Sequence, residues 1–97
     1  MNVQVTFRHM KSSPASQDYA TQKLNHITKK YVSGRDLEAQ VALSVEKFHH
    51  IANITLGVDG HTFKSCEQAE DMMSAIDLAL GKLERQLHDH KDRITRH

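Results

Sequence analysis

Apolar and polar residues alternate strictly at the start of the chain, from Asn2 to His9. Val3, Val5 and Phe7 fall on one side of an extended backbone, and the polar residues between them fall on the other. A period of two over this length is typical of a half-buried strand. The chain is therefore expected to begin with a strand that packs one side on a core.

The segment Ser12-Ser13-Pro14 is typical of a helix start, with Ser13 as the N-cap and Pro14 at the first helical position. Beyond it, apolar residues recur at spacings of three and four. They are Ala20, Leu24, Ile27 and Tyr31, with Tyr19 beside them. This pattern predicts a helix from Pro14 to about Val32 with one apolar stripe.

Alternation returns from Leu37 to Phe48, which predicts a second strand. After a connector at His49-His50, a third strand is expected from Ala52 to Val58. The pair Asp59-Gly60 is typical of a two-residue hairpin turn, in which both residues have a positive φ. A short fourth strand from His61 to Cys66 is expected to follow.

One long amphipathic helix is predicted from Glu70 to Arg93. Its apolar stripe recurs at spacings of three, four and seven, at Ile76, Leu80, Leu83, Leu87 and Ile94. At about 100° per residue, these positions share one side of the helix. Four cations fall together on an arc roughly opposite: Lys82, Arg85, Arg93 and Arg96. The helix thus has a core side and a side biased toward cations, which suits a polyanion.

The expected order of elements is β-α-β-β-β-α. Every strand alternates and both helices have a single apolar stripe. A four-stranded mixed sheet with both helices packed on one face satisfies all of these patterns. The first two strands flank a helix, so as neighbours they should be parallel. The predicted fold class is therefore α+β, with residues 1–97 forming one domain.

Composition indicates where the protein acts and how its charges could bind a polyanion. No apolar run approaches the ~20 residues that span a bilayer, and the N-terminus does not have the pattern of a signal peptide. The single cysteine, Cys66, has no partner for an internal disulfide, which fits a reducing cytoplasm. We expect a cytoplasmic protein without a membrane partner. Since 13 Lys+Arg face 12 Asp+Glu, any affinity for a polyanion depends on how the charges are segregated.

The residues do not form the patterns that catalysis requires. Cys66 is expected between a strand and a helix, but no glycine-rich or arginine-bearing loop surrounds it. His49 and His50 are adjacent, and His88 and His90 are spaced wrongly for one helix face, so no metal-ligand set forms. No glycine motif for binding nucleotide phosphates is present. We therefore expect no enzyme activity, metal, cofactor or small-molecule substrate.

The cations of the first helix follow helical spacing. Lys23, His26 and Lys30 lie at i, i+3 and i+7. If the two helices lie side by side, these residues merge with the cations of the last helix into one basic surface that neutralises phosphates. The alternative is a solvated surface with local ion pairs, such as Glu84 with His88.

The aromatic residues and the histidines indicate how the chain would bind a nucleic acid. Of five aromatic residues, Phe7, Tyr19 and Tyr31 lie on apolar stripes. Recognition of structured RNA through its backbone and shape is therefore favoured over base stacking. The chain also carries eight histidines, which begin to charge near pH ~6.5. We hypothesise that their protonation tightens binding as pH falls.

Five segments form a recognisable pattern: Val45-Glu46-Lys47, Asp59-Gly60, and residues 70–77, 82–87 and 90–93. Together with Lys23, they resemble the ribosome hibernation promoting factor family, which includes ribosome-associated inhibitors and sigma-54 modulation protein relatives. The resemblance covers essentially the whole chain and implies a β-α-β-β-β-α fold. It also implies binding to the small ribosomal subunit near the decoding region. By the resemblance, occupation of that region blocks the binding of messenger and transfer RNA. It thereby inhibits translation and preserves idle ribosomes in stationary phase or stress.

By the same resemblance, basic residues of both helices contact ribosomal RNA. The matching positions are Lys23, His26, Lys30, Lys82, Arg85, His90, Lys91 and Arg93. We expect the short hibernation factor, to which the sequence is similar, without the second domain of long members and without the acidic tail of another short branch. In that branch, formation of inactive ribosome dimers generally involves a separate small modulation protein.

Two other functional classes stay open. Strands followed by a helix are loosely similar to a generic double-stranded RNA-binding module, which should bind free duplex as well as it binds ribosomes. A small α/β acyl- or phosphoryl-processing enzyme would need an anion-binding loop and a catalytic arginine or asparagine that the sequence does not place.

Overall fold

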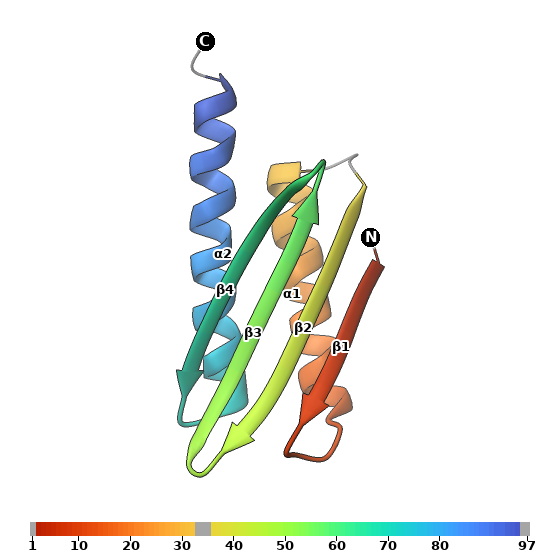
Figure 1. Ribbon diagram of the computed structural model, residues 1–97, viewed down its shortest axis with the longest axis vertical. Coiled ribbons are helices and arrows are strands. Elements are labelled where there is room, and N and C mark those ends of the chain that lie inside the picture. Colours follow the sequence, from red (N-terminus) through yellow and green to blue (C-terminus); the bar gives the residue numbers. More distant parts are fainter. Residues whose placement is uncertain (1, 33–35, 96–97) are drawn as a thin grey trace.

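A computed structural model describes residues 2–32 and 36–95, and their side chains up to residue 90. Its elements follow the predicted β-α-β-β-β-α order (Figure 1). They are β1 (Asn2–Arg8), α1 (Pro14–Val32), β2 (Leu37–Glu46), β3 (His49–Val58), β4 (His61–Ala69) and α2 (Met72–Thr95). The predicted α+β class is confirmed.

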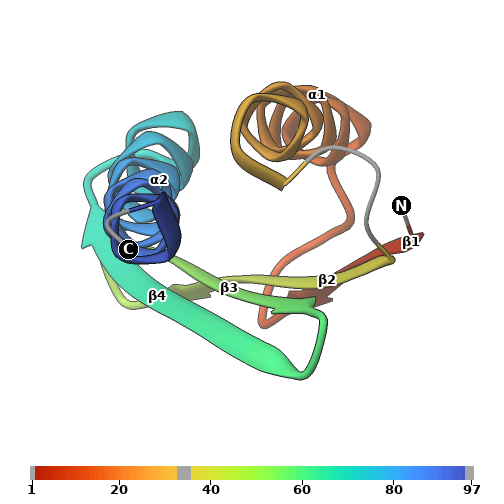
Figure 2. The ribbon, with the colours of Figure 1, turned by 90° about the horizontal axis from the view of Figure 1, so that it is seen from above.

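The strands form one four-stranded sheet in the order β1-β2-β3-β4. β1 and β2 are parallel, whereas β2 with β3 and β3 with β4 are antiparallel, so the sheet is mixed as predicted. α1 and α2 lie side by side over one face of this sheet (Figure 2). Both helices start at the end of the sheet where β2 turns into β3 (Figure 1). The opposite face of the sheet is left uncovered.

The hydrophobic core lies between the two helices and the covered face of the sheet. Inward residues of each strand alternate with outward ones, and each helix turns its single stripe toward them. The largest fully buried side chains are Leu24, Val41, Leu43, Ile54, Leu56, Ile76, Leu83 and Leu87. Burial of one such leucine or isoleucine contributes about 1.5–3 kcal/mol relative to exposure. Edge strands β1 and β4 add half-buried residues, such as Phe7 and Phe63.

Each helix begins at a side chain that accepts hydrogen bonds from the first turn. Ser13 Oγ accepts a hydrogen bond from the amide of Ser16 at 3.2 Å, which confirms the predicted cap of α1. At the start of α2, the carboxylate of Asp71 accepts bonds from the amide and the hydroxyl of Ser74, both at 2.8 Å. The amide bond and then the hydroxyl bond favour the ionised carboxylate, so the pKa of Asp71 is lowered.

The predicted connector at His49-His50 is wrong. Both histidines belong to β3, and His49 pairs with Glu46 across the hairpin. Lys47 and Phe48 are therefore the two residues of the turn, and Lys47 has a φ of 55°. Pairing with β2 includes three residues before Ala52, the first residue of the predicted strand. Periodicity cannot detect this continuation.

The other predicted boundaries near the last helix are shifted for a similar reason. β4 continues to Ala69 by pairing with β3, so Cys66 lies within the strand, opposite Asn53, and not at the strand–helix junction. α2 begins at Met72, two residues later than predicted, because Asp71 caps it. Cys66 is an exposed free thiol on the uncovered face of the sheet.

We predict that Asp71→Ala lowers the thermal unfolding midpoint by a few degrees at neutral pH, because two donors of Ser74 lose their acceptor. The pKa of Asp71 is lowered in the folded protein. Its contribution to stability is therefore present above the unfolded pKa, about 3.9, and is lost as pH falls through the folded pKa.

Circular dichroism melts at neutral and strongly acidic pH measure this difference. Asp71→Asn is the control, because its amide oxygen still accepts a hydrogen bond. An Asp71→Ala midpoint equal to that of the unsubstituted protein at neutral pH would contradict the assignment.

Candidate nucleic-acid interface

The three predicted cations of α1 are all exposed on that helix: Lys23, His26 and Lys30. Two of them also contact aromatic rings. The Lys23 ammonium lies 5.2 Å from the centroid of the Tyr19 ring, and the Lys30 ammonium lies 5.2 Å from that of Tyr31. A cation over a ring is held by the negative ring face. The two rings therefore restrain ammonium groups that stay accessible to solvent.

The flank of α2 that meets α1 is acidic. The hydroxyl of Tyr19 donates a hydrogen bond of 2.6 Å to Asp77, and Lys30 lies 3.7 Å from the carboxylate of Glu84. The hydrogen bond to Asp77 is the main reason why the pKa of Tyr19 is raised, with burial second; Lys23 opposes the change. A row of cross-helix contacts thus joins α1 to α2 at their exposed sides.

Lys82 lies on the other flank of α2, toward β4. Its ammonium is 2.5 Å from the carboxylate of Glu67, which comes from the inner face of β4. The Lys82 side chain is still 61% exposed in this pair. The helices do lie side by side, but Lys30 and Lys82 pair with carboxylates on opposite sides of α2.

Arg85 and His90 differ in their surroundings. Arg85 is exposed and has no ion pair among the side chains of residues 2–32 and 36–90. His90 instead packs on the start of β4, with its ring centroid 4.8 Å from that of His61 and 5.3 Å from that of Phe63. Arg85 is therefore the more accessible of the two to a ligand.

Two predicted contacts, Lys91 and Arg93, belong to α2, but their side chains lie outside the described part of the structure. The role of all eight predicted positions in RNA binding stays a prediction.

The observed ion pairs leave Lys30 and Lys82 accessible to solvent. Ion pairs between exposed side chains contribute only about 0–1 kcal/mol. Phosphate oxygens can therefore replace Glu84 at Lys30, or Glu67 at Lys82, at low cost. Until a ligand binds, these carboxylates hold the lysines in place. Sequence spacing did not reveal these ion pairs, because in each pair the carboxylate and the lysine come from different elements.

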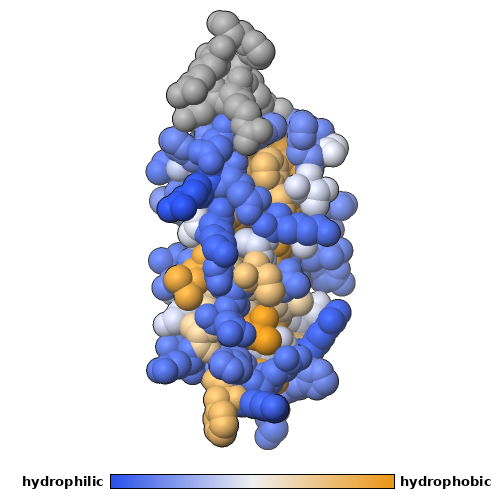
Figure 3. Space-filling view, turned by 60° about the vertical axis from the view of Figure 1, so that its left-hand side comes forward, coloured by the Kyte–Doolittle hydropathy of each residue, from blue (hydrophilic) through white to orange (hydrophobic). Residues whose placement is uncertain are grey.

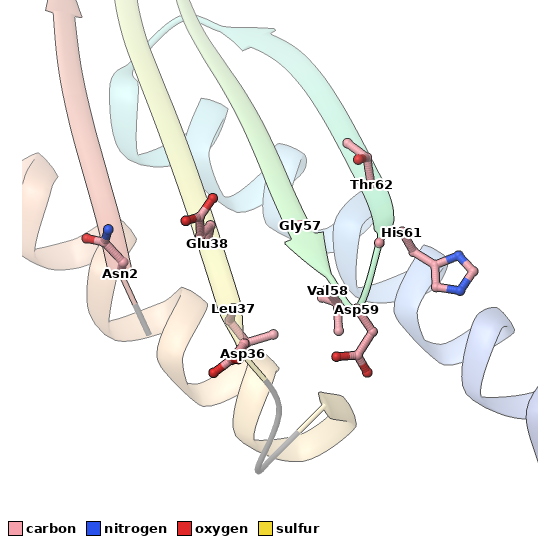
Figure 4. Close-up of a pocket in the computed structure, with 10 residues that line it drawn as sticks. Asn2, Asp36, Leu37, Glu38, Gly57, Val58, Asp59, His61 and Thr62 are labelled. Carbon is pink, nitrogen blue, oxygen red and sulfur yellow. The ribbon is translucent and has the colours of Figure 1, made fainter.

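The end of the sheet at the β3–β4 turn is acidic. A hollow of about 720 Å³ is lined there by Asp36, Glu38 and Asp59, together with Asn2 (Figure 4). His61 also lines it, although its ring points toward α2 in this view. Carboxylates at this density repel phosphate groups. A nucleic acid is thus expected to avoid this hollow.

The most exposed large hydrophobic side chain among the described residues is Phe48, which is 89% exposed at the β2–β3 turn. Leu78 and Met73 on α2 are 50% and 37% exposed. Figure 3 shows apolar surface protruding at the lower end of the molecule, among mostly hydrophilic side chains. The sequence pattern missed Phe48 because it assigned that residue to the end of a strand.

Within residues 2–32 and 36–90, no three His, Cys, Asp or Glu side chains are arranged to hold a metal ion. Among the helices described, none is both long enough and apolar enough to cross a membrane.

The arrangement of elements is shared with solved structures. The N-terminal domain of Protein Y from Thermus thermophilus superposes with a TM-score of 0.84 at 28% identity, covering 93% of this chain and 99% of that domain. A ribosomal subunit interface protein from Coxiella burnetii superposes with a TM-score of 0.83 over 95% of this chain and 99% of its own. At 24% identity, this second likeness concerns the fold alone.

Sequence relationships are equally extensive. Residues 3–95 match the family described as Sigma 54 modulation protein / S30EA ribosomal protein, and the chain belongs to this family. The ribosome hibernation promoting factor of Klebsiella oxytoca is 32% identical over 97 residues, and that of Escherichia coli K12 is 31% identical over 97 residues. Both alignments span all of this chain and all of the relative. The family resemblance inferred from the sequence motifs is therefore confirmed.

We predict that Asp77→Ala lowers the pKa of Tyr19, because the carboxylate that accepts its hydrogen bond and disfavours its ionised form is removed. The measurement is an ultraviolet absorbance titration of tyrosine. Both proteins should carry Tyr31→Phe, so that Tyr19 is the single titrating tyrosine. Glu84→Ala is the control, because it removes another carboxylate from the same flank of α2 and leaves Asp77 in place. Superimposable titrations with and without Asp77→Ala would show that the helices do not make this contact in solution.

Proposed function

We propose that this protein is a non-enzymatic ribosome hibernation factor that acts in the cytoplasm. It binds the small ribosomal subunit near the decoding region, blocks messenger and transfer RNA, and inhibits translation. Idle ribosomes are preserved in stationary phase or stress, and inactive ribosome dimers are favoured with the help of a separate modulation protein. The observation that carries the proposal is the match, over all 97 residues, to relatives named ribosome hibernation promoting factor.

The proposed mechanism is steric competition by a rigid wedge. The protein measures 47 × 21 × 19 Å, and two packed helices stiffen one face of its sheet. Basic residues of the two helices would contact phosphates of ribosomal RNA: Lys23, His26, Lys30, Lys82, Arg85, His90, Lys91 and Arg93. Release of the counterions condensed on the RNA supplies affinity in such contacts. No bond of the RNA needs to be broken, so the proposal requires no catalytic group.

The first experiment is co-sedimentation with purified ribosomes and separated subunits at moderate and high salt. We expect saturable binding to small subunits that weakens as salt rises, because phosphate contacts are screened. Transfer RNA should compete for the same place. Equal binding to free duplex RNA would favour a generic double-stranded RNA-binding module, and no association at moderate salt would remove the proposal.

We predict that Lys82→Ala/Arg85→Ala weakens binding to small subunits and reduces its salt dependence. Each lost phosphate contact should lower the slope of log affinity against log salt by about one. Both side chains are exposed, so thermal stability should change little.

Lys64→Ala is the matched control, because Lys64 is an exposed lysine of β4 on the uncovered face of the sheet. It removes a charge from a different surface. If the double substitution and the control weaken binding equally per charge removed, net charge alone governs affinity and the assignment to α2 fails.

A further inference from the structure

The tip of the β2–β3 hairpin presents an aromatic ring that the fold does not use. Phe48 is 89% exposed. The other four aromatic residues are half-buried against the core: Phe7, Tyr19, Tyr31 and Phe63. Phe48 does not lie on an apolar stripe, so its ring is free of the packing that excludes the other aromatic residues from base stacking. This ring is available to a ligand and contributes little to the core.

The backbone holds the ring away from the sheet. Glu46 and His49 pair as the last residues of their strands, so Lys47 and Phe48 alone make the turn. Lys47 has a φ of 55°, a left-handed conformation that an L-amino acid other than glycine or asparagine adopts at some cost. Backbone conformations of this kind often occur at functional sites. Because paired strands support the turn, little conformational entropy is lost when the ring is bound.

The surroundings of the ring favour RNA over an apolar protein pocket. Lys47 and His49 flank it directly, and β1 ends beside the hairpin with Arg8 opposite Ser44. Glu46, Glu70 and Asp71 are carboxylates at the same end of the sheet; Asp71 is engaged in the cap of α2. The hollow lined by three carboxylates lies at the opposite end of β3. Arg8, Lys47 and His49 thus place basic residues at the end of the sheet that carries Phe48.

We infer that Phe48 stacks on an unpaired base of the ribosomal RNA when the protein binds the small subunit. This inference rests on the proposed function and adds a contact that is independent of the helical cations. Every base has a π-face, so an aromatic ring can stack on any base that has left its helix. Duplex RNA keeps its bases stacked and offers no such face. The hairpin tip therefore gives the protein a preference for RNA with unpaired nucleotides.

The decisive experiment compares four substitutions at position 48 for affinity to purified small subunits over a range of salt. Phe48→Ala removes the ring, Phe48→Leu keeps apolar size without a π-face, and Phe48→Tyr and Phe48→Trp keep an aromatic ring. We expect the Ala and Leu proteins to bind roughly 5- to 100-fold more weakly, and the Tyr and Trp proteins to bind as the unsubstituted protein does. The salt slope should stay unchanged, because no phosphate contact is lost. Equal melting temperatures serve as the folding control.

A spectroscopic measurement tests the stacking itself. The chain has no tryptophan, so Phe48→Trp introduces a single fluorophore at the tip of the hairpin. Its emission should be quenched when small subunits are added, and competing transfer RNA should restore it. Unchanged emission in a sample that co-sediments with small subunits would overturn the inference.

The substitutions also separate the failure of this inference from that of the proposed function. If the unsubstituted protein does not bind small subunits, both are removed. If it binds and all four substituted proteins bind equally well, the ring is not in contact and only the stacking is overturned. If Phe48→Leu binds normally while Phe48→Ala does not, the ring occupies an apolar pocket of a ribosomal protein, which also overturns the stacking.

Discussion

Burial of two helical stripes against one face of a single sheet is the constraint on which the rest of this structure depends. Leu24 of α1 and Leu83 of α2 are fully buried with Leu43 and Ile54 of the central strands. A sheet covered on one side leaves the outer surfaces of both helices and the other sheet face to solvent. The cations of the helices are exposed for this reason, and the hairpin tips extend beyond the core at the two ends of the sheet (Figure 1).

The same packing decides how the charges are distributed. α1 and α2 start at the same end of the sheet and lie side by side, so Lys30 of α1 meets Glu84 of α2 and Tyr19 meets Asp77. Glu67 reaches Lys82 from the other side of α2. In water these exposed pairs are weak, and they exchange readily for phosphate contacts. The small net charge of +1 is therefore compatible with an RNA-binding surface, since an incoming phosphate replaces a carboxylate at a lysine that is already in position.

The two ends of the sheet differ in chemistry, and this polarity suggests how the molecule orients on RNA. Carboxylates surround the hollow at the β3–β4 turn. At the β2–β3 turn, a lysine and a histidine flank an exposed ring. Salt-sensitive contacts along the helices and a salt-insensitive contact at one tip would together set both the position and the direction of the protein on its site.

Local patterns of the sequence determined the element types, their order and the cap of α1, because the periods of strands and helices are set within a few residues. Alternation placed Val3, Val5 and Phe7 on one side of β1, and Ser13 began α1. Helical spacing likewise grouped the cations of α1. Only the tertiary structure decided where β3 and β4 begin and end, which carboxylate pairs with Lys82, and that Phe48 is exposed. Each of these depends on contacts between elements far apart in the chain, and neither periodicity nor spacing within one element contains that information.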